Sequence, residues 1–472
     1  MIGRRTRLAL VAVALLALGL APPAGAARKR FDTKVLAHVG DPGFPALSLV
    51  APDRTIYVGT FENPSGTDSR PSKVFAYSPA GKLLRTYVVQ GQTPGAAHGV
   101  QVAAIDRHGL LYLLDQDPPR VVTLDPRTGK QATYAKFKDV QPCVPGMTRA
   151  DCGDTVMDNP PTPDYAAWGT DGGMYVTDYT QGLVWRVPAG GGTAHVWFTD
   201  PRLDGTQFGP AGIVMLPDRR TLMLDTSGGG ATSPDATTGE LYKLPILPNG
   251  RPGALRKLWE SGPTEAPDGF ALALSGNVYM ALVGPGVNQL VVISPTGKEL
   301  TRFPKDNSGD NGSPVPFDEP SSVQFDGRRL IVTNLSFING DPSHFVIFDV
   351  FAGEPGAPVF VPGLKRPRYS LSVDRKVVTA GVRRTFHFHA GFGTQSVSGA
   401  LVSFAGKRVR TGRRGNAAIE ARFGKPGVRR ATLSLGTTVV ASTTVRVSPR
   451  PKPGPGPGGG DGDGDGDADA RR

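Results

Sequence analysis

The chain has 472 residues and a formal net charge of +12, a length that allows two or three domains. The charge is unevenly divided: residues 31–364 carry 26 basic and 34 acidic residues, whereas residues 365–450 carry 18 basic and two acidic residues. An acidic body is therefore joined to a strongly basic module, and we expect the two parts to have different partners. Beyond the amino terminus no stretch reaches about 18 unbroken apolar residues, which excludes a membrane-spanning helix from the mature protein.

The first 26 residues have the pattern of a secretory signal peptide. Arg4, Arg5 and Arg7 precede the apolar run LALVAVALLALGLA, and a small-residue site, AGA, follows at 24–26. Such a run is too short to span a bilayer and is removed on export. The sequence therefore predicts a secreted, extracellular protein, and the Arg4-Arg5 pair leaves a twin-arginine export route open.

A sequence pattern of two apolar strands joined by a polar turn recurs six times between residues 31 and 364. Each copy joins an apolar strand, a turn rich in Asp, Gly and Arg, and a second strand rich in Tyr, Leu and Val. The copies read PGFPALSLVAPDRTIYVGT, AAHGVQVAAIDRHGLLYLLD, TPDYAAWGTDGGMYVTD, FGPAGIVMLPDRRTLMLD, EAPDGFALALSGNVYMAL and DEPSSVQFDGRRLIVTN.

A third strand with a Pro- or Gly-rich turn follows each copy, and a fourth strand closes several of them. Four-stranded units repeated six times predict an all-β, six-bladed β-propeller over residues 31–364, because one such unit cannot bury both of its faces alone. A series of β-sandwiches is the alternative architecture. Between the second and third copies, Cys143 and Cys152 are predicted to form a disulfide, as suits an oxidising compartment.

In a propeller, the starts of the innermost strands converge at one mouth of the central channel. Read in register, the six copies place Phe44, His98, Asp164, Ala211, Asp268 and Glu319 at this position, with Glu265 and Asp318 as near alternatives. Acidic side chains and a histidine can bind a metal ion or move a proton. The competing interpretation is that Asp268 only shapes a turn. Asp115, Asp178 and Asp225 end the second strands and are expected to make turn or inter-blade hydrogen bonds.

Residues 35 to 362 resemble the senescence marker protein/gluconolactonase (regucalcin-like) family of six-bladed propellers. The resemblance rests on the order of PDGFALALSGNVYMAL, GPAGIVMLPDRRTLMLD and DEPSSVQFDGRRLIVTN. Family enzymes hold one divalent cation, often calcium or zinc, through an early Glu, two Asn-type ligands and the Asp of Pro-Asp-Gly. That Asp also acts as the base in lactone hydrolysis.

Carried over by position, the resemblance makes Asp268 the catalytic base and a metal ligand, and Asp164 takes the place of one Asn as a second ligand. Ala211 replaces the other Asn and Phe44 replaces the Glu, so two ligands are missing. His98, Glu319 or Glu265 could complete the site. The resemblance therefore implies a metal-assisted hydrolase of lactones or small esters. The rival hypothesis is a non-catalytic propeller that binds a small molecule or a protein.

Residues 367–448 alternate apolar and polar positions between Gly turns, which predicts an immunoglobulin-like β-sandwich. Its stretch from Gly399 to Gly427 resembles bacterial immunoglobulin-like repeats of surface proteins. Nine of its basic residues are candidates to gather on one side and bind an anionic cell-wall polymer: Arg383, Arg384, Lys407, Arg408, Arg410, Arg413, Arg414, Arg429 and Arg430. A spacer whose arginines only keep it soluble is the alternative, and a surface adhesin is a third functional class.

Two further expectations concern partners and the carboxy terminus. Nucleic acid is not expected as a partner, because the basic module has no aromatic platform for bases. We expect a monomer with a small-molecule ligand in the propeller mouth. The tail, residues 449–472, is rich in Pro, Gly and Asp and is predicted to be disordered.

Overall fold

The computed structural model describes residues 28–61, 70–96, 99–148, 152–153, 159–204, 208–228 and 237–451. In these ranges the protein is all-β, apart from two three-residue 3-10 helices, Pro201–Leu203 and Pro342–His344. Across the same ranges, no helix has the length and apolar character that crossing a bilayer requires. The predicted signal peptide and residues 452–472 of the predicted disordered tail lie outside the described residues.

Six antiparallel sheets follow one another between residues 33 and 351, each built on four strands. The first three sheets are β2 (Pro45–Val50), β3 (Ile56–Thr60), β4 (Lys73–Tyr77) and β5 (Leu83–Val88); β6 (Val100–Ile105), β7 (Leu111–Gln116), β8 (Pro119–Leu124) and β9 (Gln131–Lys136); and β12 (Pro163–Trp168), β13 (Met174–Asp178), β14 (Leu183–Val187) and β16 (His195–Thr199). A short strand, β15 (Gly192–Thr193), adds to β9 in parallel.

The second three sheets repeat the same order. They are β17 (Pro210–Met215), β18 (Thr221–Thr226), β19 (Glu240–Pro245) and β20 (Arg256–Glu260); β21 (Pro267–Leu272), β22 (Val278–Leu282), β23 (Gln289–Ile293) and β24 (Glu299–Phe303); and β25 (Pro320–Asp326), β26 (Arg329–Asn334), β27 (Val346–Phe351) and β1 (Thr33–His38). The last sheet thus takes its fourth strand from the beginning of the described chain, because β1 pairs antiparallel with β27.

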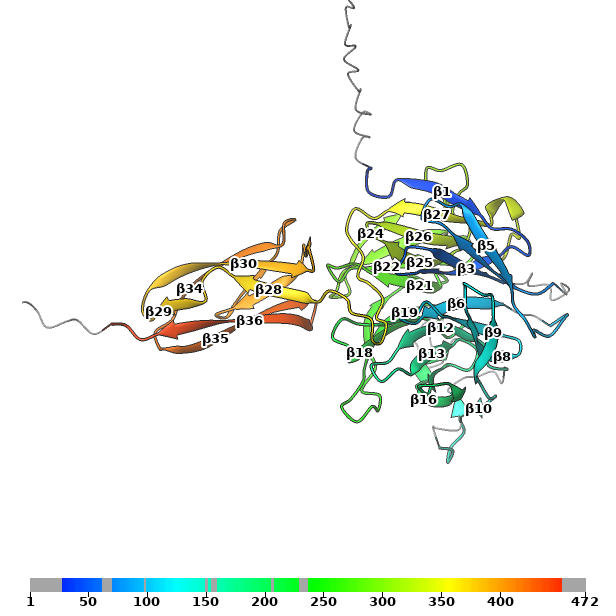
Figure 1. Ribbon diagram of the computed structural model, residues 1–472, viewed down its shortest axis with the longest axis horizontal. Coiled ribbons are helices and arrows are strands. Elements are labelled where there is room, and N and C mark those ends of the chain that lie inside the picture. The colour runs from blue at the N-terminus through cyan, green and yellow to red at the C-terminus, as the bar shows by residue number, and fades with distance from the viewer. Residues whose placement is uncertain are drawn as a thin grey trace, which may run out of the picture.

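The first strands of the six sheets form a closed ring. β2 contacts β6, β6 contacts β12, β12 contacts β17, β17 contacts β21, β21 contacts β25, and β25 contacts β2. Figure 1 shows β1 beside β27 and the inner strands β21, β25, β6 and β12 towards the middle of this body. The arrangement is β-propeller-like, and the pairing of β1 with β27 ties the two ends of the ring together.

The core lies between neighbouring sheets. Every residue of β3, β13 and β22 is buried, whereas the outer strand β5 is almost wholly exposed. The second strands are covered by a sheet on either side, so both of their faces are apolar, while outer strands alternate towards solvent. The fully buried Trp185 in β14 packs in the cluster that joins the second and third sheets.

Five of the six inner strands begin with a proline and shift register directly after it. A proline is tolerated at the first position of a strand because its missing N–H is not needed there. A bulge at this point re-aims the following side chains. In β12, for example, Asp164 and Tyr165 stand opposite the single residue Thr177.

The carboxy-terminal sheets, residues 369–448, pack face to face around one apolar core as a β-sandwich. One sheet contains β28 (Tyr369–Val373), β30 (Arg383–Phe392), β31 (Gln395–Ser396) and β34 (Asn416–Arg422). The other contains β29 (Val377–Thr379), β36 (Thr438–Ser448), β35 (Gly427–Leu435), β32 (Leu401–Phe404) and β33 (Lys407–Arg410). The sandwich projects away from the ring (Figure 1) and touches it where Oη of Tyr369 donates to the Leu274 carbonyl at 3.1 Å.

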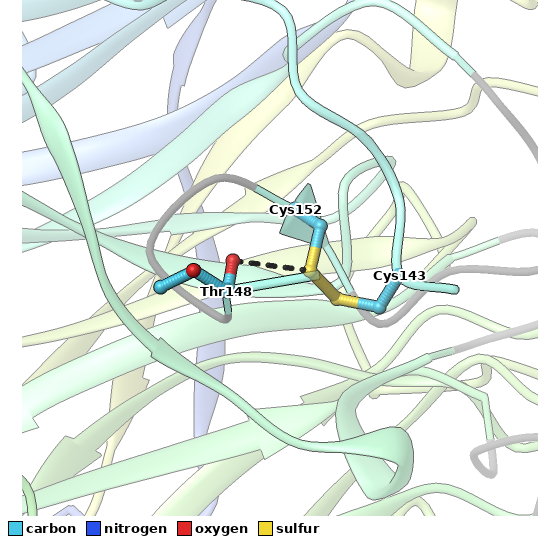
Figure 2. Close-up of a disulfide and its surroundings, with 3 residues drawn as sticks. All are labelled: Cys143, Thr148 and Cys152. Carbon is cyan, nitrogen blue, oxygen red and sulfur yellow. Dashed lines mark hydrogen bonds between the residues drawn. A yellow bond between two sulfur atoms is a disulfide. The ribbon is translucent and has the colours of Figure 1, made fainter. Parts of the chain in front are cut away.

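The predicted disulfide between Cys143 and Cys152 is confirmed. It closes the segment between the second and third sheets, beside the short pair β10 (Gln141–Pro142) and β11 (Cys152–Gly153). Figure 2 shows the Thr148 carbonyl facing Sγ of Cys152, at 3.7 Å. Because a disulfide sulfur carries no proton, this approach is a van der Waals contact.

Candidate functional site

The strand pairing corrects the predicted register at the channel mouth. The residue that follows the first position of each inner strand is Ala46, Gln101, Asp164, Ala211, Asp268 and Ser321. Asp164, Ala211 and Asp268 therefore occupy the predicted position. Phe44 and Glu319 were placed there wrongly, and the position expected for His98 belongs to Gln101. His98 itself lies outside the described residues.

The error has a local structural cause. Phe44, Ala266 and Glu319 each stand immediately before the proline that opens an inner strand, and all three have positive φ, at 48°, 44° and 54°. They belong to the turn that leads into the strand. The predicted register set Phe44 and Glu319, which precede their prolines, level with Asp268, which follows its proline, and so it mixed turn residues with strand residues.

Asp164 and Asp268 come from the inner strands of the third and fifth sheets and act on each other electrostatically across β17. Asp164 is buried, and its Oδ1 accepts a hydrogen bond from Nε2 of Gln101 at 2.7 Å. Asp268 keeps partial contact with solvent. The Tyr165 hydroxyl lies beside Asp268 and donates to the Ser321 carbonyl at 3.2 Å. A Cβ on Gly269 would come within 2.3 Å of this hydroxyl oxygen, so glycine makes the approach possible.

Asp225, near the end of β18, is a third member of this cluster that sequence reasoning missed. It is fully buried, and within the described ranges neither of its carboxylate oxygens has a hydrogen-bond partner of good geometry. It faces the bulge of β17, where a Cβ on Gly212 would lie 3.2 Å from its Oδ1. The turn or inter-blade hydrogen bonds predicted for Asp225 are present only as weak contacts with the backbone amides of Gly212 and of Asp225 itself. The sequence signal was the pair of small residues, Ala211 and Gly212, opposite an acidic one.

The three carboxyl groups hold their protons unusually strongly. Burial raises the pKa of Asp268 to about 7, although the Tyr165 hydroxyl and the Gly269 amide act in the opposite direction. Burial, followed by repulsion from Asp268, raises the pKa of Asp164 and of Asp225 well above the ordinary range. The cluster therefore titrates as a unit in which Asp268 ionises first and its charge keeps the other two protonated.

Asp115 and Asp178 have a different role, as the sequence predicts for them. Asp115 accepts from Nε of Arg120 at 2.9 Å and from Gln92 at 2.8 Å. Asp178 accepts from Nε1 of Trp185 at 2.8 Å and from backbone amides at 2.9 and 3.1 Å. Both carboxylates are saturated by hydrogen bonds that fasten strands and loops together, and this distinguishes them from Asp225.

The other predicted acidic residues lie in the loops before the inner strands and are committed to contacts there. Glu265 forms a two-pronged ion pair with Arg302, at 2.5 and 3.0 Å. Glu319 is buried and accepts from the Ile338 amide at 2.8 Å. Asp318 accepts from Ser336 at 2.5 Å and contacts Nδ1 of His344 at 2.8 Å. None of these groups is among those that act on the pKa of Asp164 or Asp268.

The described residues do not fit the divalent cation that the resemblance implies. Calcium and zinc need several ligands at about 2.0–2.6 Å from one point. In the ranges the structure describes, no group of three or more His, Cys, Asp or Glu side chains has such an arrangement. The donors at this site are oxygens that repel one another, and Ala211 brings no donor. We therefore derive no chemical step through a metal.

The opposite end of the channel opens into a cavity of about 960 Å³. Tyr165 forms part of its wall, together with inner-strand residues and the linker to the β-sandwich. In this linker Val361 is buried in the core of the ring, and Arg219 stacks over the Phe360 ring at 5.1 Å. The linker thus occupies the far side of the channel, and Tyr165 separates the cavity from the carboxyl cluster.

Comparisons with known proteins leave the family open. No protein-family model matches the chain, and no curated protein matches it. Among solved structures, an auxiliary nutrient binding protein from Bacteroides thetaiotaomicron is similar with 10% identity, a TM-score of 0.44, and coverage of 65% of this chain and 69% of that chain. A nidogen/laminin complex has 14% identity, a TM-score of 0.40 and coverage of 65% and 94%.

An enzyme is also among the similar structures. A putative 6-phosphogluconolactonase from Bacteroides fragilis has 10% identity, a TM-score of 0.34, and coverage of 83% of this chain and 98% of that chain. With TM-scores this low, none of these likenesses carries an argument about chemistry. The regucalcin-like resemblance stays a prediction, and the functional argument rests on the carboxyl cluster.

Proposed function

We propose that the chain is an exported six-bladed β-propeller that hydrolyses lactones or related small esters, followed by an immunoglobulin-like domain. The observation that carries the proposal is Asp268: burial raises the pKa of its carboxyl to about 7, and the residue as a whole keeps partial contact with solvent. A general base works best when its pKa lies near the working pH. The hydroxyl of Tyr165 lies beside it and donates to the Ser321 carbonyl.

The two groups divide the chemistry of ester hydrolysis between them. Ionised Asp268 accepts a proton from a water molecule as the water oxygen bonds to the ester carbonyl carbon. Burial raises the pKa of Tyr165, so its hydroxyl stays protonated, and by turning from the Ser321 carbonyl it can donate to the oxyanion that forms. The bond from the carbonyl carbon to the alcohol oxygen then breaks, and Asp268 returns its proton to that oxygen. The products are a carboxylic acid and an alcohol, with no other reactant consumed.

Turnover of a panel of γ- and δ-lactones and aryl esters tests the proposal. Asp268→Asn should lower kcat/KM at least about 100-fold, because general-base catalysis contributes roughly that much or more. Asp53→Asn, at an exposed turn where the carboxylate accepts from the Thr55 amide, is the matched control and should leave turnover unchanged. No turnover by the wild type, or equal turnover by Asp268→Asn, would contradict the proposal. Elemental analysis of the same protein tests the predicted calcium or zinc.

A second function is supported by the charges of the β-sandwich. Tyr369 and Gly436 lie at the end of the sandwich that meets the ring, since Gly436 approaches the Pro295 carbonyl. The strand pairing places most basic residues at the opposite end. We define this basic tip as Arg383, Arg384, Lys407, Arg408, Arg422, Lys425, Arg429 and Arg430.

The basic tip differs from the predicted set of nine basic residues, because Arg410, Arg413 and Arg414 lie at the other end of the sandwich. Arg410 donates to the Gly399 carbonyl at 2.9 Å, near the ring, and Arg413 and Arg414 lie in the turn beside it. In the tip, by contrast, Arg383 pairs directly opposite Arg422, and Glu420, 3.7 Å from Arg383, brings a single carboxylate to these two facing charges. Like charges on facing positions are destabilising unless an anion neutralises them. This supports the tip as the binding surface for an anionic cell-wall polymer.

Binding of full-length protein to immobilised poly(glycerol phosphate) tests this second function. The double variant Lys407→Glu/Arg408→Glu should weaken binding at least tenfold, and rising salt should weaken it in the wild type. Arg410→Glu/Arg413→Glu, with the same charge change at the other end, should bind like the wild type. Equal losses in both variants would contradict a localised tip, and equally tight binding of duplex DNA would contradict the expectation that nucleic acid is not a partner.

A further inference from the structure

The carboxyl cluster has an electrostatic feature that ester hydrolysis does not use. Asp164, Asp225 and Asp268 approach one another from three strands, and repulsion among them is a main influence on Asp164 and Asp225. Within the part of the chain that the structure describes, no lysine, arginine or histidine is among the groups that act on the pKa of Asp164 or Asp268. Buried acidic groups are normally paired with a cation or hydrogen-bonded.

A neutral side chain next to the cluster also lacks a partner. Gln101 is buried and its Nε2 donates to Asp164, but its Oε1 is buried without a hydrogen-bond partner among the described residues. Both oxygens of Asp225 also lack a well-aligned hydrogen bond from the described residues, although the Gly212 amide is near enough to oppose the rise in its pKa. Buried acceptors without donors are rare in folded proteins. Among the described residues, the amide oxygen of Gln101 and the carboxylate of Asp225 are thus buried near Asp164 without a well-aligned donor, which favours a ligand rich in N–H groups.

The spacing of the cluster favours a ligand larger than a metal ion. The carboxyl groups are near enough to repel one another, yet among the described residues they do not converge as metal ligands. Ala211, between Asp164 and Asp268 in strand order, leaves only a methyl group at that position of the ring. An ammonium group directs three N–H donors outwards over about 2.7–2.9 Å each, and so it can bridge carboxylates that are too far apart for one small ion.

We propose that the cluster binds the protonated amino group of a small organic ligand, with Asp164 and Asp268 as acceptors and the charge of Asp225 behind them. This inference rests on the proposed function and narrows its substrate class to lactones or esters that carry an amino group. Oδ1 of Asp164 is occupied by Gln101, and its second oxygen is available for the ligand. Asp225, with no solvent exposure, contributes through its charge alone.

Proton linkage follows from the same arrangement. Without ligand, Asp164 and Asp225 hold protons because their pKa values are raised by burial and by Asp268. The other acidic groups that face the cluster are Asp178, Tyr165 and Tyr179. A bound ammonium group favours the ionised carboxylates, so binding should release protons and strengthen as the pH rises from 5 to 8. A neutral ligand that accepts hydrogen bonds from protonated carboxyls would show the opposite dependence.

Calorimetric titration of the full chain with 4-aminobutan-1-ol, beside the uncharged butane-1,4-diol, tests the inference. We expect the amine to bind at least tenfold more tightly than the diol, with an affinity that rises between pH 5 and 8 and with proton release measured in buffers of different ionisation enthalpy. Asp164→Asn and Asp225→Asn should each weaken amine binding at least fivefold, and Asp53→Asn should not change it. Tryptophan fluorescence shows whether each variant is folded.

Equal binding of amine and diol, affinity that falls with rising pH, or unchanged amine binding in both cluster variants would overturn the inference. The outcomes separate it from the proposed function. If Asp268→Asn loses lactone turnover but the wild type does not bind the amine, the hydrolase proposal stands and only the amino-group specificity is refuted. Amine binding without turnover of any ester would leave a binding protein and remove the hydrolase. Tight binding of Ca²⁺ alone that excludes the amine would assign the cluster to a metal instead.

Discussion

Replacing Asp268 with asparagine should make the ring more stable at neutral pH, even though it removes the proposed base. The pKa of Asp268 is about 7 in the folded protein against an ordinary value of 3.8. Between these two values the folded chain binds one more proton than the unfolded chain, so the free energy of unfolding falls as the pH rises. Above the folded-state pKa, ionised Asp268 destabilises the folded chain by the full amount. Below the ordinary pKa, this destabilisation is absent. The asparagine variant carries no such cost at any pH.

The size of the effect follows from the shift. About three pKa units at 1.36 kcal/mol each correspond to roughly 4 kcal/mol, and because Asp268 retains contact with solvent we expect about 2–4 kcal/mol. The variant should match the wild type near pH 4 and exceed it by this amount at pH 8. Asp53→Asn should follow the wild type throughout.

Urea unfolding followed by tryptophan fluorescence measures this difference. All four tryptophans, at positions 168, 185, 197 and 259, lie in the ring, so the signal reports on this part of the protein and not on the β-sandwich. Midpoints at pH 4, 5, 6, 7 and 8 give the dependence. A constant difference between variant and wild type across the range, or an asparagine variant less stable than the wild type at pH 8, would refute the reasoning.

Two further substitutions probe the surroundings of the cluster. Gly269→Ala would place Cβ 2.3 Å from the Tyr165 hydroxyl oxygen. We therefore expect a lower melting temperature and at least a tenfold loss of lactone turnover. Wild-type values for both would show that the close approach of Tyr165 to residue 269 is not required. Asp178→Ala removes the acceptor of Trp185 and of two backbone amides, and because unsatisfied buried donors cost about 1–3 kcal/mol, it should lower the free energy of unfolding by about that much at pH 7, as urea midpoints will show. A neutral effect would contradict a structural role for Asp178.

The sequence predicted the strands of the ring well because their pattern is local. Alternating apolar residues, a polar turn and a second apolar strand recur in each copy, and the structure has paired strands at each of them. The disulfide could also be predicted, since Cys143 and Cys152 are the two cysteines of a chain whose sequence predicts export. The pairing of β1 with β27 was not predicted, because it joins segments about 310 residues apart that share no distinctive motif.

The carboxyl cluster was predicted only in part, for a physical reason. Asp164 and Asp268 were found because they follow a proline at the start of an inner strand. Asp225 was missed because its side chain reaches the same place from the second strand, through a gap left by Gly212. Gln101 was missed because its strand lacks the opening proline that fixes the register elsewhere. Which side chains share a site depends on bulges and on small neighbours, and neither is visible in strand periodicity.

The central claim is that Asp268 acts as a general base within the carboxyl cluster, and the pH dependence of kcat/KM tests it most directly. For the lactone that the wild type turns over best, kcat/KM should rise with pH along a limb centred near pH 7, the pKa of Asp268. Asp268→Asn should lose this limb together with at least about 99% of the activity. An unchanged profile in the variant, or a wild type that hydrolyses no lactone or ester at any pH, would contradict the account.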